Sequence, residues 1–503
     1  MADTSAYAGD FQLKSVIPDR AQVPTIADSG SILARQKASI YPQTLQAQTI
    51  NPSTNGSPVI FKLSDTRAYT DLRSCQLEFD ATVYGVTTSS GGSSPTYTSN
   101  FAAFDESALA WINRIRVLVG GVLAEDIQEV NIISQIKKMM TYQVRNCIDK
   151  QISGGGKYAN DQFVDSGADD QPNGTGNFSP GAIAARMREC IRTTCASSSN
   201  LGWRGGAAQT AAANQYTIHC SIPLRLISGF FNSKQWFYLR NASIQVEFYP
   251  ETPQEALVNV SGGVSGYGNA LPYYKLENIA FRMDNYILDN SIVEIIDGVI
   301  GTRGLVYGFE TTTTMVTQFI GSNVSIPFTR AVSDATQFTF VAQPQAVSNN
   351  YNYWGLTTWR IPGLDNVQLQ IGATPMPLNT MNPQCRVNSW LQMWNGDGAD
   401  TLSSTTVPSF ALDCSDDELA AVVPVDATAY GGPGKLQGIG ISLRRTNTEG
   451  LFFVNAGYNT ALDSGAMSLR FTSGDGATQY VGYAFLQYVR LMTLAGGRVS
   501  ISS

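Results

Sequence analysis

Charged side chains are scarce in this chain. Of its 503 residues only 15% are Asp, Glu, Lys or Arg, against about 25% in an average soluble domain. The formal net charge is −7, whereas a protein that binds nucleic acid through its phosphates usually carries a basic excess. Residues 1–40, where a basic arm would be expected, carry equal numbers of both signs, namely Lys14, Arg20, Arg35 and Lys37 against Asp3, Asp10, Asp19 and Asp28. We therefore expect no sequence-specific nucleic-acid binding.

Long apolar runs are missing as well. No stretch approaches the ~18 continuous apolar residues of a membrane span, and the opening "MADTSAYAGDFQLKS" lacks the apolar core of a signal peptide. The seven cysteines are odd in number and irregularly spaced. These features predict a protein made inside a cell, without secretion, and with mostly free thiols.

Histidine occurs once, at His219. A Ser-His or Cys-His catalytic site would have to use it. It lies in "YTIHCSIPL", which alternates like a strand, and no nucleophile motif accompanies it. We expect a strand histidine beside a hydrogen-bonding partner and no catalytic residue.

Three further motifs contain residue types that occur in metal or cofactor sites. Cys190 and Cys195 form the only close cysteine pair, and a structural zinc site usually needs four soft ligands. "GGPGK" (431–435) lacks the phosphate-loop pattern, because Ala429 stands where Gly is needed and Leu436 where Ser or Thr is needed. "SDDELA" (415–420) groups three carboxylates but is typical of a solvated turn or helix start. The sequence predicts no metal site and no cofactor.

Strand signals, by contrast, are frequent. "CQLEFDATVY" (75–84) alternates apolar and polar residues, as a half-buried strand does. Residues 114–127 read as a hairpin around Gly120 and Gly121, and residues 128–142 have helical spacing. Other predicted strands lie at 57–64, 242–248, 276–288, 337–343, 367–371, 438–444, 466–471, 483–494 and 497–502, and "SIVE" (291–294) predicts the start of a short helix. The 46 glycines and 21 prolines agree with many turns.

The order of these signals predicts two β-rich domains. We expect an extended arm over 1–40, a first domain over 41–250, a linker over 251–272 and a second domain over 273–503. A polar stretch at 148–214, which contains the helical segment "SPGAIAARMRECIR", is predicted to be a long loop insertion in the first domain.

An aromatic-rich stretch, "SGFFNSKQWFYL" (228–239), separates two predicted strands. Such a stretch can be an exposed platform on which sugars or bases stack. It can also be a core corner that joins the strands. Because all its neighbours are strands, the second interpretation is favoured.

Four segments, in their order along the chain, resemble the double jelly-roll major capsid proteins of double-stranded DNA viruses, the group of nucleocytoplasmic large viruses, virophages and polinton-like viruses. They are "SIPLRLISGFFNSKQWFYLRNASIQVEF" (221–248), which matches the end of the family's first jelly roll, "MDNYILDNSIVEIID" (283–297), which matches the opening of the second, "SIPFTRAVSDATQFTFV" (325–341), and "YAFLQYVRLMTLAGGRVSIS" (483–502), which matches the last strands. The resemblance covers residues 45–503.

The resemblance implies an all-β fold of two consecutive eight-stranded jelly rolls with short helices. It implies a structural protein, not an enzyme, whose homotrimers form the pseudo-hexameric capsomers of an icosahedral virus shell. Its partners would be further copies of itself, neighbouring capsomers, and penton and minor capsid proteins. Its location would be the virion.

A second hypothesis is a carbohydrate-binding or carbohydrate-cleaving β-sandwich protein. The acidic balance, the aromatic residues and the Asn/Ser/Thr-rich composition are compatible with it. The missing signal peptide and the lack of a clear catalytic carboxylate pair argue against it.

Overall fold

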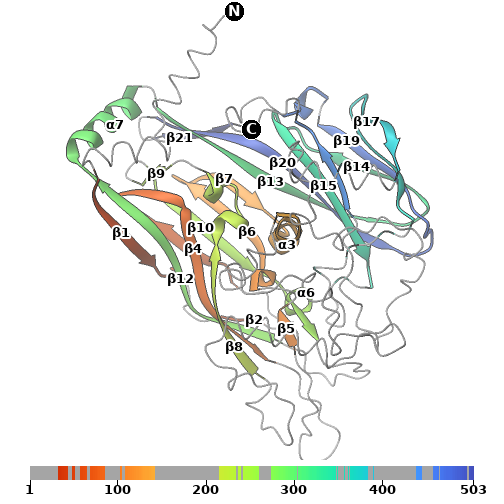
Figure 1. Ribbon diagram of the computed structural model, residues 1–503, viewed down its shortest axis with the longest axis horizontal. Helices are drawn as coiled ribbons and strands as arrows, with labels where there is room; N and C mark the ends of the chain where they lie inside the picture. The colour runs from red at the N-terminus through yellow and green to blue at the C-terminus, as the bar shows by residue number, and fades with distance from the viewer. Residues whose placement is uncertain are drawn as a thin grey trace, which may run out of the picture.

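The computed structural model describes the chain over residues 32–43, 48–50, 57–64, 68–84, 102–104, 108–141, 215–233, 236–239, 242–259, 273–302, 304–346, 348, 356, 359, 361, 363–382, 389, 438–444, 457–463, 465–495 and 498–502. Most of these residues lie in antiparallel strands. Figure 1 shows two β-sandwiches side by side, with the long strands of the second reaching back to the first.

The first sandwich pairs two sheets. Sheet 1 has the strand order β1 (Ile32–Ile40), β12 (Tyr273–Leu288), β4 (Ala68–Tyr84) and β8 (Gln215–Pro223), with β2 (Gln48–Ile50) beside β12 and β9 (Trp236–Tyr238) beside β4. Sheet 2 has the order β3 (Val59–Leu63), β10 (Ile244–Pro250), β6 (Ile112–Val119) and β7 (Val122–Ile127). A small sheet of β5 (Ala102–Phe104) and β11 (Leu257–Asn259) lies beside them.

The second sandwich repeats this architecture. Sheet 3 has the order β13 (Leu305–Phe319), β20 (Tyr480–Ala495), β15 (Ala335–Pro344) and β18 (Gly438–Ser442), with β21 (Arg498–Ser502) also on β20. Sheet 4 has the order β14 (Asn323–Thr329), β19 (Ala466–Thr472), β16 (Asp365–Ile371) and β17 (Thr374–Met381). Each sandwich is thus built on two four-stranded paths whose neighbours are mostly distant in sequence, the topology of a jelly roll. The predicted all-β double jelly roll is confirmed.

Alternation explains why these strands form. In β4 the side chains of Cys75, Leu77 and Phe79 are buried, while Gln76 and Glu78 between them are partly exposed. One face of the strand therefore enters the core and the other does not. The predicted hairpin is also confirmed, because Gly120 and Gly121 take the positive φ angles of +56° and +82° between β6 and β7.

The described helices are short. They are α3 (Val130–Thr141), α6 (Pro253–Ala256) and α7 (Asn290–Thr302), with 3₁₀ turns η1 (Ala108–Trp111), η5 (Leu224–Leu226), η6 (Phe230–Asn232) and η8 (Thr460–Asp463). The helix predicted over 128–142 is α3. The N-cap of α7 differs from the prediction. The helix begins at Asn290, so Asp289 and not Ser291 is the N-cap, and the Asp289 carboxylate accepts a hydrogen bond from the Ser291 amide at 2.9 Å. Among the described residues, no helix has both the length and the apolar character to cross a membrane.

Two strand placements differ from the predicted domain limits. Ile32–Ile40, assigned to the arm, forms β1 and pairs with β12. Tyr273–Leu288, assigned to the second domain, is paired on both sides within sheet 1, with β1 and with β4. Pairing partners depend on distant residues, so alternation within one strand does not reveal them. The expected linker also holds α6 and β11 in its described part. Residues 1–31 and the insertion 148–214 lie outside the described residues.

The cores of the two jelly rolls are not separate. One cluster fills the second sandwich, with Phe338, Phe340 and Leu486 among its members. The other fills the first sandwich and continues into the second, where it includes Tyr307 and Phe309 of β13. We call the contact of β7, α3, α6 and residues 224–239 with β13, β15 and β20 the seam.

Candidate functional site

Residues 224–239, here called the corner, are the centre of the seam. They run through η5, η6 and β9 after β8 ends, and their aromatic side chains are buried, namely Phe230, Phe231, Trp236, Phe237 and Tyr238. Buried rings cannot serve as a platform for sugars or bases, so the interpretation as a core corner holds and the platform is excluded.

The corner packs its rings against both jelly rolls. Phe231 lies 5.8 Å from Phe281 of β12, in sheet 1. Phe230 meets Phe309 of β13 edge to face at 5.4 Å, and Phe237 lies 5.1 Å from Tyr307 of the same strand. Contacts of this kind contribute beyond the apolar area that they bury. The corner therefore joins sheet 1 to sheet 3.

A buried carboxylate fixes the conformation of the corner. Glu125 of β7 accepts hydrogen bonds from the Ser228 hydroxyl, from the Gly229 amide at 3.0 Å and from the Phe230 amide at 3.4 Å. Thr311 of β13 also hydrogen-bonds it. Burial raises the pKa of the Glu125 carboxyl, and these donors act in the opposite direction. One side chain thus connects β7, the corner and β13.

The backbones of the two rolls approach closely at Gly229. A Cβ atom built on Gly229 would overlap the carbonyl oxygen of Glu310 in β13. The φ angle of Gly229 is −71°, which any residue can adopt. Glycine is therefore required here for space and not for backbone conformation. Arg490 of β20 adds a second link, since its Nη1 donates to the carbonyl of Ala124 at 2.6 Å.

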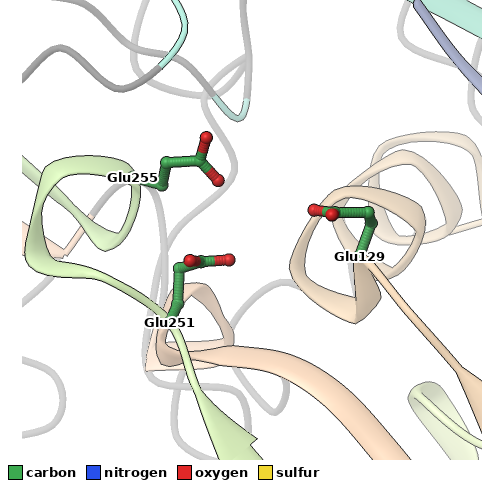
Figure 2. Close-up of side chains that lie close together, drawn as sticks. All are labelled: Glu129, Glu251 and Glu255. Carbon is green, nitrogen blue, oxygen red and sulfur yellow. The ribbon is translucent and has the colours of Figure 1, made fainter. Parts of the chain in front are cut away.

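Three carboxyl groups gather at another part of the seam. Glu129 precedes α3, Glu251 follows β10 and Glu255 lies in α6, and Figure 2 shows their side chains directed toward one another. Their nearest carboxylate oxygens all lie within 4.8 Å of one another. Ser348 of the second roll reaches this group, its hydroxyl lying 3.5 Å from Glu255 Oε1.

The three carboxyl groups differ in the hydrogen bonds that the protein donates to them and in their pKa values. Glu251 accepts from Asn113 at 2.6 Å, from Asn131 at 3.2 Å and from the Thr252 amide at 2.7 Å. Burial, and then the charge of Glu251, raise the pKa of Glu129 to about 7. Burial, followed by the charges of Glu251 and Glu129, raises the pKa of Glu255 to about 8. At neutral pH the group therefore holds protons that ordinary carboxyls would have lost.

Carboxylate oxygens are also ligands of hard cations. Among the described residues, Glu129, Glu251 and Glu255 are the set whose oxygens are close enough to hold one. No local pattern in the sequence predicts this group, because its members come from three separate elements. A glutamate just before a helix and another within one are ordinary features of a sequence.

The residues singled out in the sequence are not brought together. His219 lies in β8 with its backbone opposite Asp80 of β4. Cys190 and Cys195, "GGPGK" (431–435) and "SDDELA" (415–420) lie outside the described residues. Cys75 and Cys220 are buried free thiols of the described part. The expectations that the chain has no catalytic, cofactor or metal site stay predictions.

No protein-family model matches the sequence, and no curated protein matches it. Solved structures do match the fold. A chain of the Sputnik virophage, seen by cryo-EM, is 11% identical with a TM-score of 0.54, and the match covers 94% of this chain and 89% of that one. At this identity the likeness defines the fold alone.

The fold and the seam define a double jelly-roll protein. The same fold, over almost the same length, is that of the Faustovirus major capsid protein, which is 12% identical with a TM-score of 0.51. That match covers 98% of this chain and 100% of the Faustovirus chain.

A methyl group at Gly229 tests the close approach of the rolls. We expect Gly229→Ala to destabilise the protein by about 1–3 kcal/mol, because the corner or β13 must move. Gly298→Ala in α7 is the matched control, since a Cβ there meets no atom within 4 Å. Thermal melting of both variants measures the difference. Equal melting temperatures would contradict the close approach.

The three buried carboxyl groups of Glu129, Glu251 and Glu255 predict that the stability of the protein depends on pH. A folded-state pKa raised above the unfolded value favours folding at low pH, and this contribution is lost as pH rises through the folded pKa. With the pKa of Glu129 at about 7 and of Glu255 at about 8, stability should fall between pH 5 and pH 9. Glu255→Gln should raise the melting temperature at pH 9 by about 2–5 °C and flatten the profile.

Glu294→Gln is the control for this pH profile. It removes the same charge from an exposed position of α7 and should leave the profile unchanged. A wild-type melting temperature that rises from pH 6 to pH 9 would refute the assignment of shared protons.

Proposed function

We propose that this chain is a structural major capsid protein whose trimers are the pseudo-hexameric capsomers of an icosahedral virus shell. The observation that carries the proposal is the double jelly roll, which matches the Faustovirus major capsid protein over 98% of this chain. A building block that spans two complete sandwiches is the simplest reading of a match at that length.

The geometry of the two rolls supports this role. Two sandwiches of like topology lie side by side in one chain. Three copies around an axis would present six similar sandwiches, which is how a three-fold assembly fills a six-fold place in a shell. The seam supports such use, because a tile of a shell needs its two halves held at one angle.

Composition supports extensive contacts between copies. Only 15% of the residues are charged, so few ions lose their water when surfaces meet. The proposed partners are further copies of this chain, neighbouring capsomers, and penton and minor capsid proteins. The proposed location is the virion, and no direct sequence-specific contact with nucleic acid is part of the role.

The carbohydrate hypothesis loses its main support in the structure. The aromatic residues that favoured it are the buried rings of the corner. The three carboxyl groups of Glu129, Glu251 and Glu255 are also unlike a glycosidase pair. Their oxygens lie within 4.8 Å of one another, whereas the two catalytic carboxyls of a glycosidase are about 5–5.5 Å or about 6.5–9.5 Å apart.

Purified protein tests the proposal directly. Sedimentation at micromolar concentration should give a trimer, and negative-stain images should show three-fold particles or shells. The contact area should exceed the ~2,000 Å² typical of obligate interfaces. A protein that stays monomeric at high concentration would contradict the proposal.

His219 separates a structural protein from a hydrolase. His219→Gln keeps a polar side chain of similar reach, so trimer yield should be unchanged. A hydrolase that used this histidine would lose about 10²–10⁴-fold in rate. The paired measurement is trimer yield and hydrolysis of a panel of glycans and esters. We expect no activity in either protein; an activity that disappears in the variant would contradict a purely structural role.

A further inference from the structure

The outer face of sheet 2 has a regular arrangement of side chains. Side chains that point away from the core form cross-strand rows over β3, β10, β6 and β7. In the first row the strand register places Gln245 between Lys62 and Leu118, and Leu123 of β7 ends the row. In the second row Glu247 lies between Ile60 and Arg116, and Asp126 of β7 ends the row. In the third row Tyr249 lies beside Arg114. The face therefore combines aliphatic, aromatic and paired charged residues.

The charged residues of this face are bound to one another. Arg114 makes a bidentate ion pair with Asp126, with N–O distances of 2.7 and 2.6 Å. Arg116 binds Glu247 at 3.0 Å, and Glu247 also accepts from Tyr249 at 2.9 Å and from Gln245 at 2.8 Å. The positive charges of the two guanidinium groups and the negative charges of the two carboxylates cancel. With Lys62 included, the face has a single net positive charge.

The outer face of sheet 1 provides a contrast within the same sandwich. Its arginines are also ion-paired, Arg35 with Asp284 and Arg282 with Glu78, but they extend further into solvent, with 58% of the Arg35 side chain and 55% of the Arg282 side chain exposed. On sheet 2 the corresponding values are 31% for Arg114 and 29% for Arg116. Arg and Tyr side chains that lie half-buried next to aliphatic residues are more typical of protein interfaces than largely exposed arginines.

We infer that the outer face of sheet 2 is where a second copy of this chain binds. The inference rests on the proposed function, in which this chain assembles with itself. The charge balance favours that partner, because each copy carries a net charge of −7 and copies repel one another at acidic surfaces. A face whose acids are internally paired, with one lysine left over, is a place where an acidic copy can approach.

The chain also offers a suitable surface for the other side of such a contact. Along β14 the exposed residues alternate with buried ones, and none of them is charged: Asn323, Ser325, Pro327 and Thr329. The neighbouring strand β19 adds one exposed ion next to this row, Arg470 opposite Ser325, so burying the row itself desolvates few charges. Two different faces in contact generate a closed ring when the rotation that relates the copies closes, as the three-fold rotation of the proposed trimer does.

Paired variants of the full chain test the inference. Leu118→Asp and Lys62→Glu change the outer face of sheet 2, at residues that lie on the surface side of their strands. Leu33→Asp and Lys37→Glu make the same changes on the exposed side of β1 in sheet 1. Sedimentation velocity over a concentration series measures assembly, and thermal melting shows that each variant is folded.

We expect the two sheet 2 variants to raise the apparent dissociation constant of the oligomer by about tenfold or more, while the sheet 1 variants assemble like wild type. If wild type assembles and the folded sheet 2 variants assemble equally well, the inference is overturned and the proposed function stands. If wild type itself never assembles, the proposed function fails and the inference falls with it. Should Leu118→Asp not fold, Lys62→Glu alone gives the answer, because Lys62 is exposed.

Discussion

The contact between the corner and β13 is the constraint on which the rest of the structure depends. Here the backbone of Gly229 lies against the carbonyl of Glu310, and Phe230 packs on Phe309. The first core continues through this contact into the second roll. Other links between the rolls, such as the hydrogen bond from Arg490 to the Ala124 carbonyl, lie around this contact. Together these contacts make a single body of the two rolls.

The seam achieves this with polar groups as well as apolar ones. Glu125 is completely buried, and its oxygens accept from the corner and from β13. A buried carboxylate is costly unless it is well hydrogen-bonded, so its donors must stay in one arrangement. The group of Glu129, Glu251 and Glu255 differs, because burial and mutual repulsion favour its protonated state. The seam thus combines a site that fixes geometry with one that responds to pH.

Local patterns predicted much of the fold and little of the seam. Alternation located β4 and β10, and paired glycines located the turn between β6 and β7. β13 was missed, because its middle is a run of four threonines, Thr311–Thr314, which breaks the apolar alternation. β12 was recognised as a strand but placed with the wrong sheet, since its partners β1 and β4 are distant in sequence. The cluster of Glu129, Glu251 and Glu255 could not be predicted for the same reason, because only the folded chain brings these three residues together.

Calorimetry tests the central claim most directly. If the seam makes one body of the two jelly rolls, the wild-type protein at pH 6 should unfold in a single transition, with equal calorimetric and van't Hoff enthalpies per folding unit. Two separate transitions, each with the enthalpy of one sandwich, would show that the rolls unfold independently and would contradict this account.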